Sequence, residues 1–219
     1  MLFKVINYLS IICLFAACAP TRFIKPLNKG EHAINVSLGG PLIKFSNSTI
    51  PIPFTTIVYG YGLKENITLF GSLHTTSILF GVFQTDIGCV TSLYKNDSLR
   101  IGITVAPTLN LSIDKWEKVA KLWPQIDFNF YKQHKKQMFY IGVANWFDLS
   151  VLKAHKEVQQ THWLLNPHIG YSYCKPVWTF NIELKLLAPT INRQPNVVDY
   201  RGFGNTGAIG TYFSVTRKF

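Results

Sequence analysis

The chain has 219 residues, of which 47% are hydrophobic, 14% aromatic and only 15% charged. This composition excludes an intrinsically disordered protein, which needs a high net charge and few hydrophobic residues. No run of about 20 apolar residues follows the N-terminal region, so a bundle of membrane-spanning helices is excluded as well. The net charge of +11 is spread out, with no Lys/Arg run longer than a pair such as Lys135–Lys136. We therefore expect no nucleic-acid partner and assign most of this charge to solvated loops and turns.

The N-terminal residues 1–17 have the organisation of an export signal. A short basic start is followed by the apolar stretch Val5–Leu14, which is too short to span a bilayer comfortably. Two alanines ending at Ala17 then precede Cys18. This pattern resembles a bacterial lipoprotein signal, which implies cleavage before Cys18, acylation of its thiol by a palmitate-type chain, and no other cofactor. Residues 18–29 would then be a short tether, and ordinary signal cleavage is the alternative.

Residues 30–219 show the two-residue period of β-strands in most of their length. In the clearest case Trp178, Phe180, Ile182 and Leu184 alternate with polar side chains, as a strand with one apolar face does. We predict ten strands, over roughly 31–39, 54–63, 66–75, 78–93, 99–112, 125–132, 137–146, 162–173, 177–187 and 207–219.

The connections between these strands alternate in length. Short turns lie near residues 64–65, 95–98, 133–136 and 174–176, whereas 40–53, 113–124, 147–161 and 188–206 are long. Such alternation indicates an all-β, up-and-down antiparallel β-barrel of about 10 strands, with 8–12 possible. Bacterial outer-membrane barrels have short periplasmic turns and longer outer loops. In the loop 113–124 we also predict a short helix over 115–123, because Asp114 and Glu117 form a capping-box pattern.

The distribution of charge distinguishes a membrane barrel from a water-soluble one. The apolar faces of the predicted strands carry no charged residue before Arg217, near the end. A charge on a lipid-facing position costs about 2–4 kcal/mol at mid-depth, so these faces suit contact with lipid. The opposite faces carry few charges among small polar residues, as a narrow lumen would. The predicted lumen polar cluster is Asp86, Arg100, Asp127, His168, Glu183 and Lys185.

Aromatic residues gather near the predicted strand ends, where interfacial rings are favoured. Toward the long loops lie Trp116, Trp123, Trp146 and Trp163, and toward the short turns lie Tyr94, Tyr131 and Tyr173. The last strand alternates apolar residues up to the terminal Phe219. With the signal, the meander and this ending, the chain resembles small outer-membrane β-barrels, in a lipoprotein form of the kind seen in Bacteroidota. The resemblance implies that barrel assembly machinery reads Phe219 as an assembly signal.

The sequence contains no phosphate-binding glycine loop, metal-binding Cys pair or nucleophile elbow. Loop groups such as His162, His155 and Ser150 leave a barrel-rim hydrolase of lipid or peptide as one alternative. A soluble periplasmic lipocalin-like binder of apolar ligands is another, and it requires the Trp178 face to point inward. Cys89 and Cys174 are predicted to be free thiols on separate strands. Basic loop residues are candidates for lipopolysaccharide contact: Lys115, Lys118, Lys121, Lys153 and Lys156.

The favoured prediction is a monomeric outer-membrane β-barrel lipoprotein of a Gram-negative cell envelope, anchored by lipid at Cys18 on the periplasmic side. Its expected role is structural or surface recognition, with outer-membrane lipid and lipopolysaccharide as neighbours. A barrel this small leaves little room for a water channel.

Overall fold

The computed structural model describes residue 20 and residues 22–116, 118–151, 158–193 and 198–219. These residues form a closed antiparallel β-barrel of ten long strands, with one short extra strand and one short helix. The elements are β1 (His32–Phe45), β2 (Ser48–Pro51), β3 (Phe54–Lys64), β4 (Ile67–His74), α2 (Thr75–Leu79), β5 (Val82–Asn96), β6 (Ile101–Asp114), β7 (Val119–His134), β8 (Gln137–Phe147), β9 (Trp163–Cys174), β10 (Trp178–Asn192) and β11 (Thr206–Lys218).

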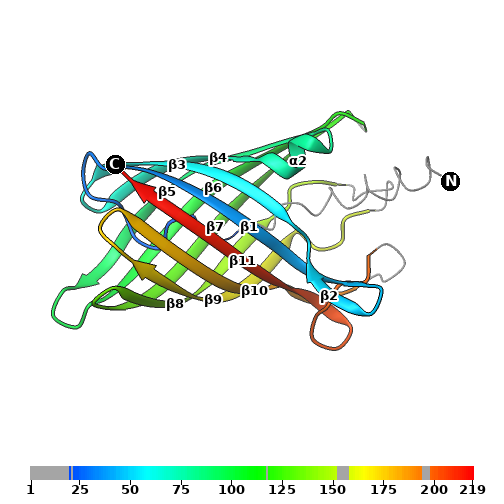
Figure 1. Ribbon diagram of the computed structural model, residues 1–219. Coiled ribbons are helices and arrows are strands. Elements are labelled where there is room, and N and C mark those ends of the chain that lie inside the picture. The colour runs from blue at the N-terminus through cyan, green and yellow to red at the C-terminus, as the bar shows by residue number, and fades with distance from the viewer. Residues whose placement is uncertain (1–19, 21, 117, 152–157, 194–197) are drawn as a thin grey trace.

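The strands follow one another around the barrel in chain order. Each long strand pairs with its predecessor, and β1 pairs with β11 from Ala33↔Lys218 to Pro41↔Gly210, which closes the sheet. The short strand β2 only folds back on the end of β1. The strands are tilted, and the C-terminus lies at the end opposite α2 and β2 (Figure 1). The predicted up-and-down barrel of ten strands is confirmed.

The apolar strand faces point outward and the polar faces point into the lumen. On β10 the side chains of Phe180, Ile182 and Leu184 are exposed. Glu183 and Lys185, at the alternate positions, are buried. The other long strands show the same alternation, and many of their buried side chains are Ser, Thr and Asn. An exposed apolar belt around a polar interior suits contact with lipid and would be costly in water. The outward Trp178 face contradicts the lipocalin-like alternative, which needs this face inside.

The connections at the α2 end are more ordered than predicted. β6 and β7 extend to Asp114 and from Val119, so most of the predicted loop 113–124 is strand. The helix predicted over 115–123 is therefore wrong: cross-strand pairing of Leu111 with Leu122 outweighs the local capping pattern. β1 likewise extends to Phe45 in the predicted loop 40–53, and the short strand β2 lies within the same range. None of the helices among the described residues has the length and apolar character needed to cross a membrane.

The aromatic residues divide between the two faces. Trp116, Trp163 and Tyr94 are largely exposed, as expected for rings at a membrane interface. Trp146 and Tyr131 are buried in the lumen instead, because they occupy inward positions of the strand alternation. Cys89 and Cys174 are free thiols, as predicted.

Candidate functional site

The most distinctive feature of the lumen is a piece of the chain's own N-terminal region. Pro20 and residues 22–30, here called the plug, precede β1; the part up to Leu27 lies inside the barrel, and residues 28–30 are exposed at its mouth. Phe23, Ile24 and Leu27 are each only 5–6% exposed. The sequence predicted residues 18–29 as a short tether, and the structure places the apolar side chains of its described part inside the barrel. Burial of these apolar side chains favours the lumen over water.

The plug enters at the end of the barrel where the short turns and the C-terminus lie. There Gly30 donates its backbone N–H to Gly62 O over 2.8 Å. Deeper in, Leu27 N donates to Thr68 Oγ1 over 2.7 Å and Thr104 Oγ1 donates to Ile24 O over 2.7 Å. The plug therefore runs, read backward from Gly30 to Pro20, from the short-turn mouth into the interior.

Two glycines of β3, Gly60 and Gly62, allow the plug to lie close to the barrel wall. A Cβ added at Gly62 would lie 1.9 Å from Asn28 O, and one at Gly60 would lie 2.6 Å from the Phe23 ring. Both contacts are shorter than any van der Waals approach, so a side chain at either position collides with the plug. The wall of the barrel is thus shaped for close approach of this segment.

Arg22 anchors the plug to a buried carboxylate. Its guanidinium forms an ion pair with Asp86 on β5, and the same carboxylate accepts hydrogen bonds from Ser72 and from His74 Nε2, the latter over 2.9 Å. The Arg22 and Asp86 side chains are 9% and 0% exposed. A buried charge is tolerated only when it is paired and hydrogen-bonded, so Asp86 and Arg22 satisfy each other.

A second buried network occupies the wall formed by β8 and β10. Lys185 Nζ lies 3.3 Å from Glu183 Oε1, and the Tyr140 hydroxyl donates to Glu183 Oε2 over 2.9 Å. Lys185 also lies over the Tyr212 ring, 5.9 Å from its centre. This ion pair satisfies two charges that would otherwise be costly in a low-dielectric lumen.

Five of the six residues predicted to form the lumen cluster are buried inside the barrel. Asp127 Oδ1 accepts from Gln125 Nε2 over 2.7 Å, and His168 Nε2 pairs with Asn129 Oδ1 over 2.7 Å. Arg100 is the exception. It lies exposed in the turn between β5 and β6 with a φ of 55°, because β6 begins at Ile101, two residues after the predicted start of this strand at residue 99.

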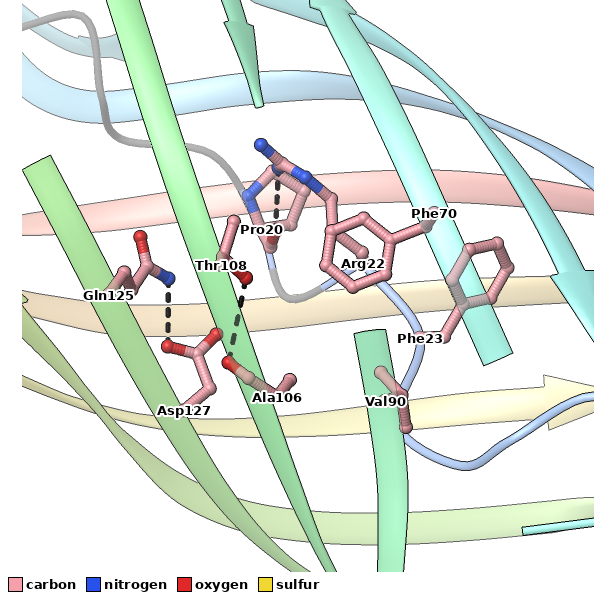
Figure 2. A pocket seen from close by; sticks show the side chains of 9 residues that line it. All are labelled: Pro20, Arg22, Phe23, Phe70, Val90, Ala106, Thr108, Gln125 and Asp127. Carbon is pink, nitrogen blue, oxygen red and sulfur yellow. Dashed lines mark hydrogen bonds between the residues drawn. The ribbon is translucent and has the colours of Figure 1, made fainter. Parts of the chain in front are cut away.

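Little space remains between the plug and the barrel wall. Figure 2 shows Pro20, Arg22 and Phe23 of the plug among side chains of β4–β7, including Phe70, Val90 and Asp127. The cavity that these residues line has a volume of about 10 Å³, which is room for about one water molecule. Between the plug and the wall formed by β4–β7, the side chains therefore leave little space.

The described residues considered for a rim enzyme, Ser150 and His162, both contact Asp148. Ser150 Oγ and Ser150 N both donate to Asp148 Oδ1, and His162 Nδ1 pairs with the Asp148 backbone oxygen. Neither contact joins a hydroxyl to an imidazole base, which a Ser–His mechanism needs. His155 and Glu157 lie outside the described residues.

The lysines predicted to contact lipopolysaccharide are only partly described. Lys115 and Lys118 are exposed in the turn between β6 and β7, and Lys121 is half-buried at the start of β7. Lys153 and Lys156 lie outside the described residues, as does Cys18. The described lysines of this set, Lys115, Lys118 and Lys121, therefore lie at the α2 end of the barrel.

The C-terminal strand places its outward residues as the sequence predicted. Phe213, Val215 and Phe219 are exposed on the apolar face. Arg217, which interrupts this face, stacks on Trp178 and Phe219 with its guanidinium carbon 5.6 and 4.9 Å from the ring centres. An arginine over aromatic rings suits the boundary between lipid and water.

No protein-family model and no curated protein matches the chain. Several solved structures of outer-membrane β-barrels resemble it in fold. An outer-membrane channel from Pseudomonas putida F1 has a TM-score of 0.50 and 9% identity, over 92% of this chain and 100% of that one. The translocator domain of the autotransporter NalP from Neisseria meningitidis has a TM-score of 0.47 and 8% identity, over 99% and 96%. At such identities the likeness shows a shared barrel fold and nothing about activity.

Proposed function

We propose that this protein is an outer-membrane β-barrel closed by its own N-terminal plug, with a structural or surface-recognition role rather than steady transport. The observation that carries this proposal is the anchoring of Arg22 to Asp86 inside a lumen that the plug fills. The outward apolar belt supports a place in the membrane, and the exposed basic turn at Lys115 and Lys118 supports contact with anionic surface groups.

Lipid anchoring at Cys18 is part of this proposal and rests on the signal-like residues 1–17 alone. The short-turn end would face the periplasm, because short periplasmic turns are the rule in outer-membrane barrels. Barrel assembly machinery would then recognise the strand that ends at Phe219. A monomer suffices, since the ten long strands close on themselves without an open edge.

Membrane insertion is tested by fractionation and by electrophoresis with and without boiling. We expect the protein to stay with outer membranes through carbonate washing and to change mobility on boiling, as closed barrels do. Release by carbonate together with an unchanged mobility would contradict a membrane barrel.

Closure by the plug is tested by conductance in planar lipid bilayers. We compare the chain from residue 20 onward with the same chain lacking residues 20–29. The plugged protein should remain closed, whereas the shortened barrel should show discrete openings. Equal, sustained conductance of both proteins would contradict closure by the plug and leave the membrane-barrel assignment intact. The matched control is Asp148→Asn, which changes a charge in a loop outside the lumen.

A further inference from the structure

An open hollow of about 310 Å³ lies at the short-turn mouth of the barrel. It is bounded by the plug, by the turn between β5 and β6, and by the turn between β7 and β8. Four cationic side chains line it, Lys25, Lys95, Arg100 and Lys135, and a single carboxylate, Asp97. The volume falls at the lower end of the range of about 300–1,000 Å³ that small-molecule sites occupy.

Among the residues that the structure describes, three of these cations have no carboxylate within ion-pair distance. Lys95 Nζ pairs with Asp97 Oδ1 over 2.8 Å, so those two charges offset each other. Among the described residues, no ion pair involves Lys25, Arg100 or Lys135. The mouth therefore concentrates positive charge around a hollow that is open to water, which attracts anions.

One side chain, Gln133, ties the three cationic segments together. Its Oε1 accepts from Lys25 Nζ over 2.8 Å, its Nε2 donates to Lys135 O over 3.1 Å, and its backbone N donates to Arg100 O over 2.8 Å. These bonds fix the backbone at Arg100 and Lys135 and the ammonium of Lys25 relative to one residue, so the segments that carry the three cations are held together at the mouth.

Of the three cations, Lys25 is the one whose charged form an anion in the hollow would stabilise most. Its ammonium has three donors, and Gln133 is the acceptor that the structure gives it among the described residues. Burial lowers the pKa of Lys25, because desolvation disfavours its charged form. An anion in the hollow would offset this desolvation and would hold the plug by one of its own residues.

We propose that the short-turn mouth binds a small, soluble molecule bearing a phosphate or diphosphate group, through Lys25, Arg100 and Lys135. Guanidinium groups bind phosphate oxygens in a bidentate manner, and ammonium groups act on them as point charges. The source is aqueous rather than a bilayer lipid, because Lys25 and Tyr131 reach the hollow from the lumen side, whereas lipid meets the outward faces.

The test is calorimetric titration of the detergent-solubilised chain with inorganic pyrophosphate. We expect saturable binding that weakens with added salt, and a loss of affinity of about tenfold or more in Arg100→Gln and in Lys25→Gln, as for removal of a charge-assisted hydrogen bond. The matched control is Lys44→Gln, which removes the same charge from an exposed position at the opposite end of the barrel and should bind like the wild type. Folding of each variant is verified by its mobility before and after boiling.

Two results would overturn the proposal. The first is absence of saturable pyrophosphate binding, or equal affinities in Arg100→Gln, Lys25→Gln and Lys44→Gln. The second comes from a parallel titration with short-chain phosphatidic acid in the same detergent. Binding of this lipid without binding of pyrophosphate would assign the mouth to a lipid headgroup and contradict a soluble ligand. Arg100 lies outside the plug, so its variant reports on the site even if Lys25→Gln loosens the plug.

Discussion

Arg22 and Asp86 form a buried ion pair although 64 positions separate them in the chain. The pair joins the plug to the middle of β5, where Ser72 and His74 of β4 also bind the Asp86 carboxylate. The segment that the sequence predicted as a short tether is therefore bound to the barrel interior through an ion pair. The relationship makes the stability of the barrel dependent on residues that precede its first strand.

Replacement of Arg22 by Ala should lower the free energy of unfolding by about 3 kcal/mol or more, because removing one partner leaves a buried charge uncompensated. The double variant Arg22→Ala/Asp86→Asn should recover part of this loss, since the remaining side chain carries no charge. Denaturant unfolding followed by tryptophan fluorescence measures both. A double variant no more stable than Arg22→Ala would show that the ion pair contributes nothing specific.

A methyl group at Gly62 should displace the plug. The added Cβ would meet the backbone oxygen of Asn28, and backbone cannot move aside as a flexible side chain can. We expect Gly62→Ala to expose the bond after Arg22 to trypsin while the wild type resists cleavage there. Mass spectrometry of the products identifies the site.

The matched control for this experiment is Gly71→Ala on the neighbouring strand β4. A Cβ at Gly71 has Asp86 O as its nearest neighbour at 3.7 Å, an ordinary contact. Protection of Arg22 should therefore persist in Gly71→Ala. Equal protection in both variants would mean that the plug is seated by contacts other than this close approach.

The barrel could be predicted from the sequence because strand alternation is a local signal that a lipid-facing sheet makes unusually strong. Phe180, Ile182 and Leu184 all point to the outward face of β10, and the other long strands show the same two-residue period. Turn positions followed from Pro, Gly, Asn and Lys clusters. The outer hairpins were missed because extension of strands such as β6 and β7 depends on pairing between residues far from any turn signal.

The plug could not be predicted, because its cause is non-local. In the sequence, Phe23, Ile24 and Leu27 are not distinguishable from an apolar linker. Their burial depends on the close approach of this segment to Gly60 and Gly62, which are more than 30 positions away in the chain. The inward carboxylate of Asp86 requires a cationic partner, but Arg22, Lys25 and Lys29 all precede the barrel and Arg100 lies on a neighbouring predicted strand. The sequence alone does not distinguish among these cations.

The lipid-facing belt predicts a depth-dependent response to charge. Leu184→Arg places a guanidinium near the middle of β10 on the outward face and should cost about 2–4 kcal/mol in lipid vesicles. Val177→Arg, in the turn before β10, should cost about 0–1 kcal/mol because it lies near the interface. Denaturant titration of refolded protein in vesicles measures both. Equal, small losses would indicate that this face meets water.

Burial of Lys25 predicts a pH dependence of stability. Its pKa is lowered in the folded protein, so between that value and the ordinary pKa of a lysine the unfolded chain binds more protons than the folded one. Stability gained from this group therefore rises as the pH rises through that window. In denaturant titrations, wild type should gain stability relative to Lys25→Met as pH increases toward 10.5. A constant difference across the same pH range would contradict burial of a titrating Lys25.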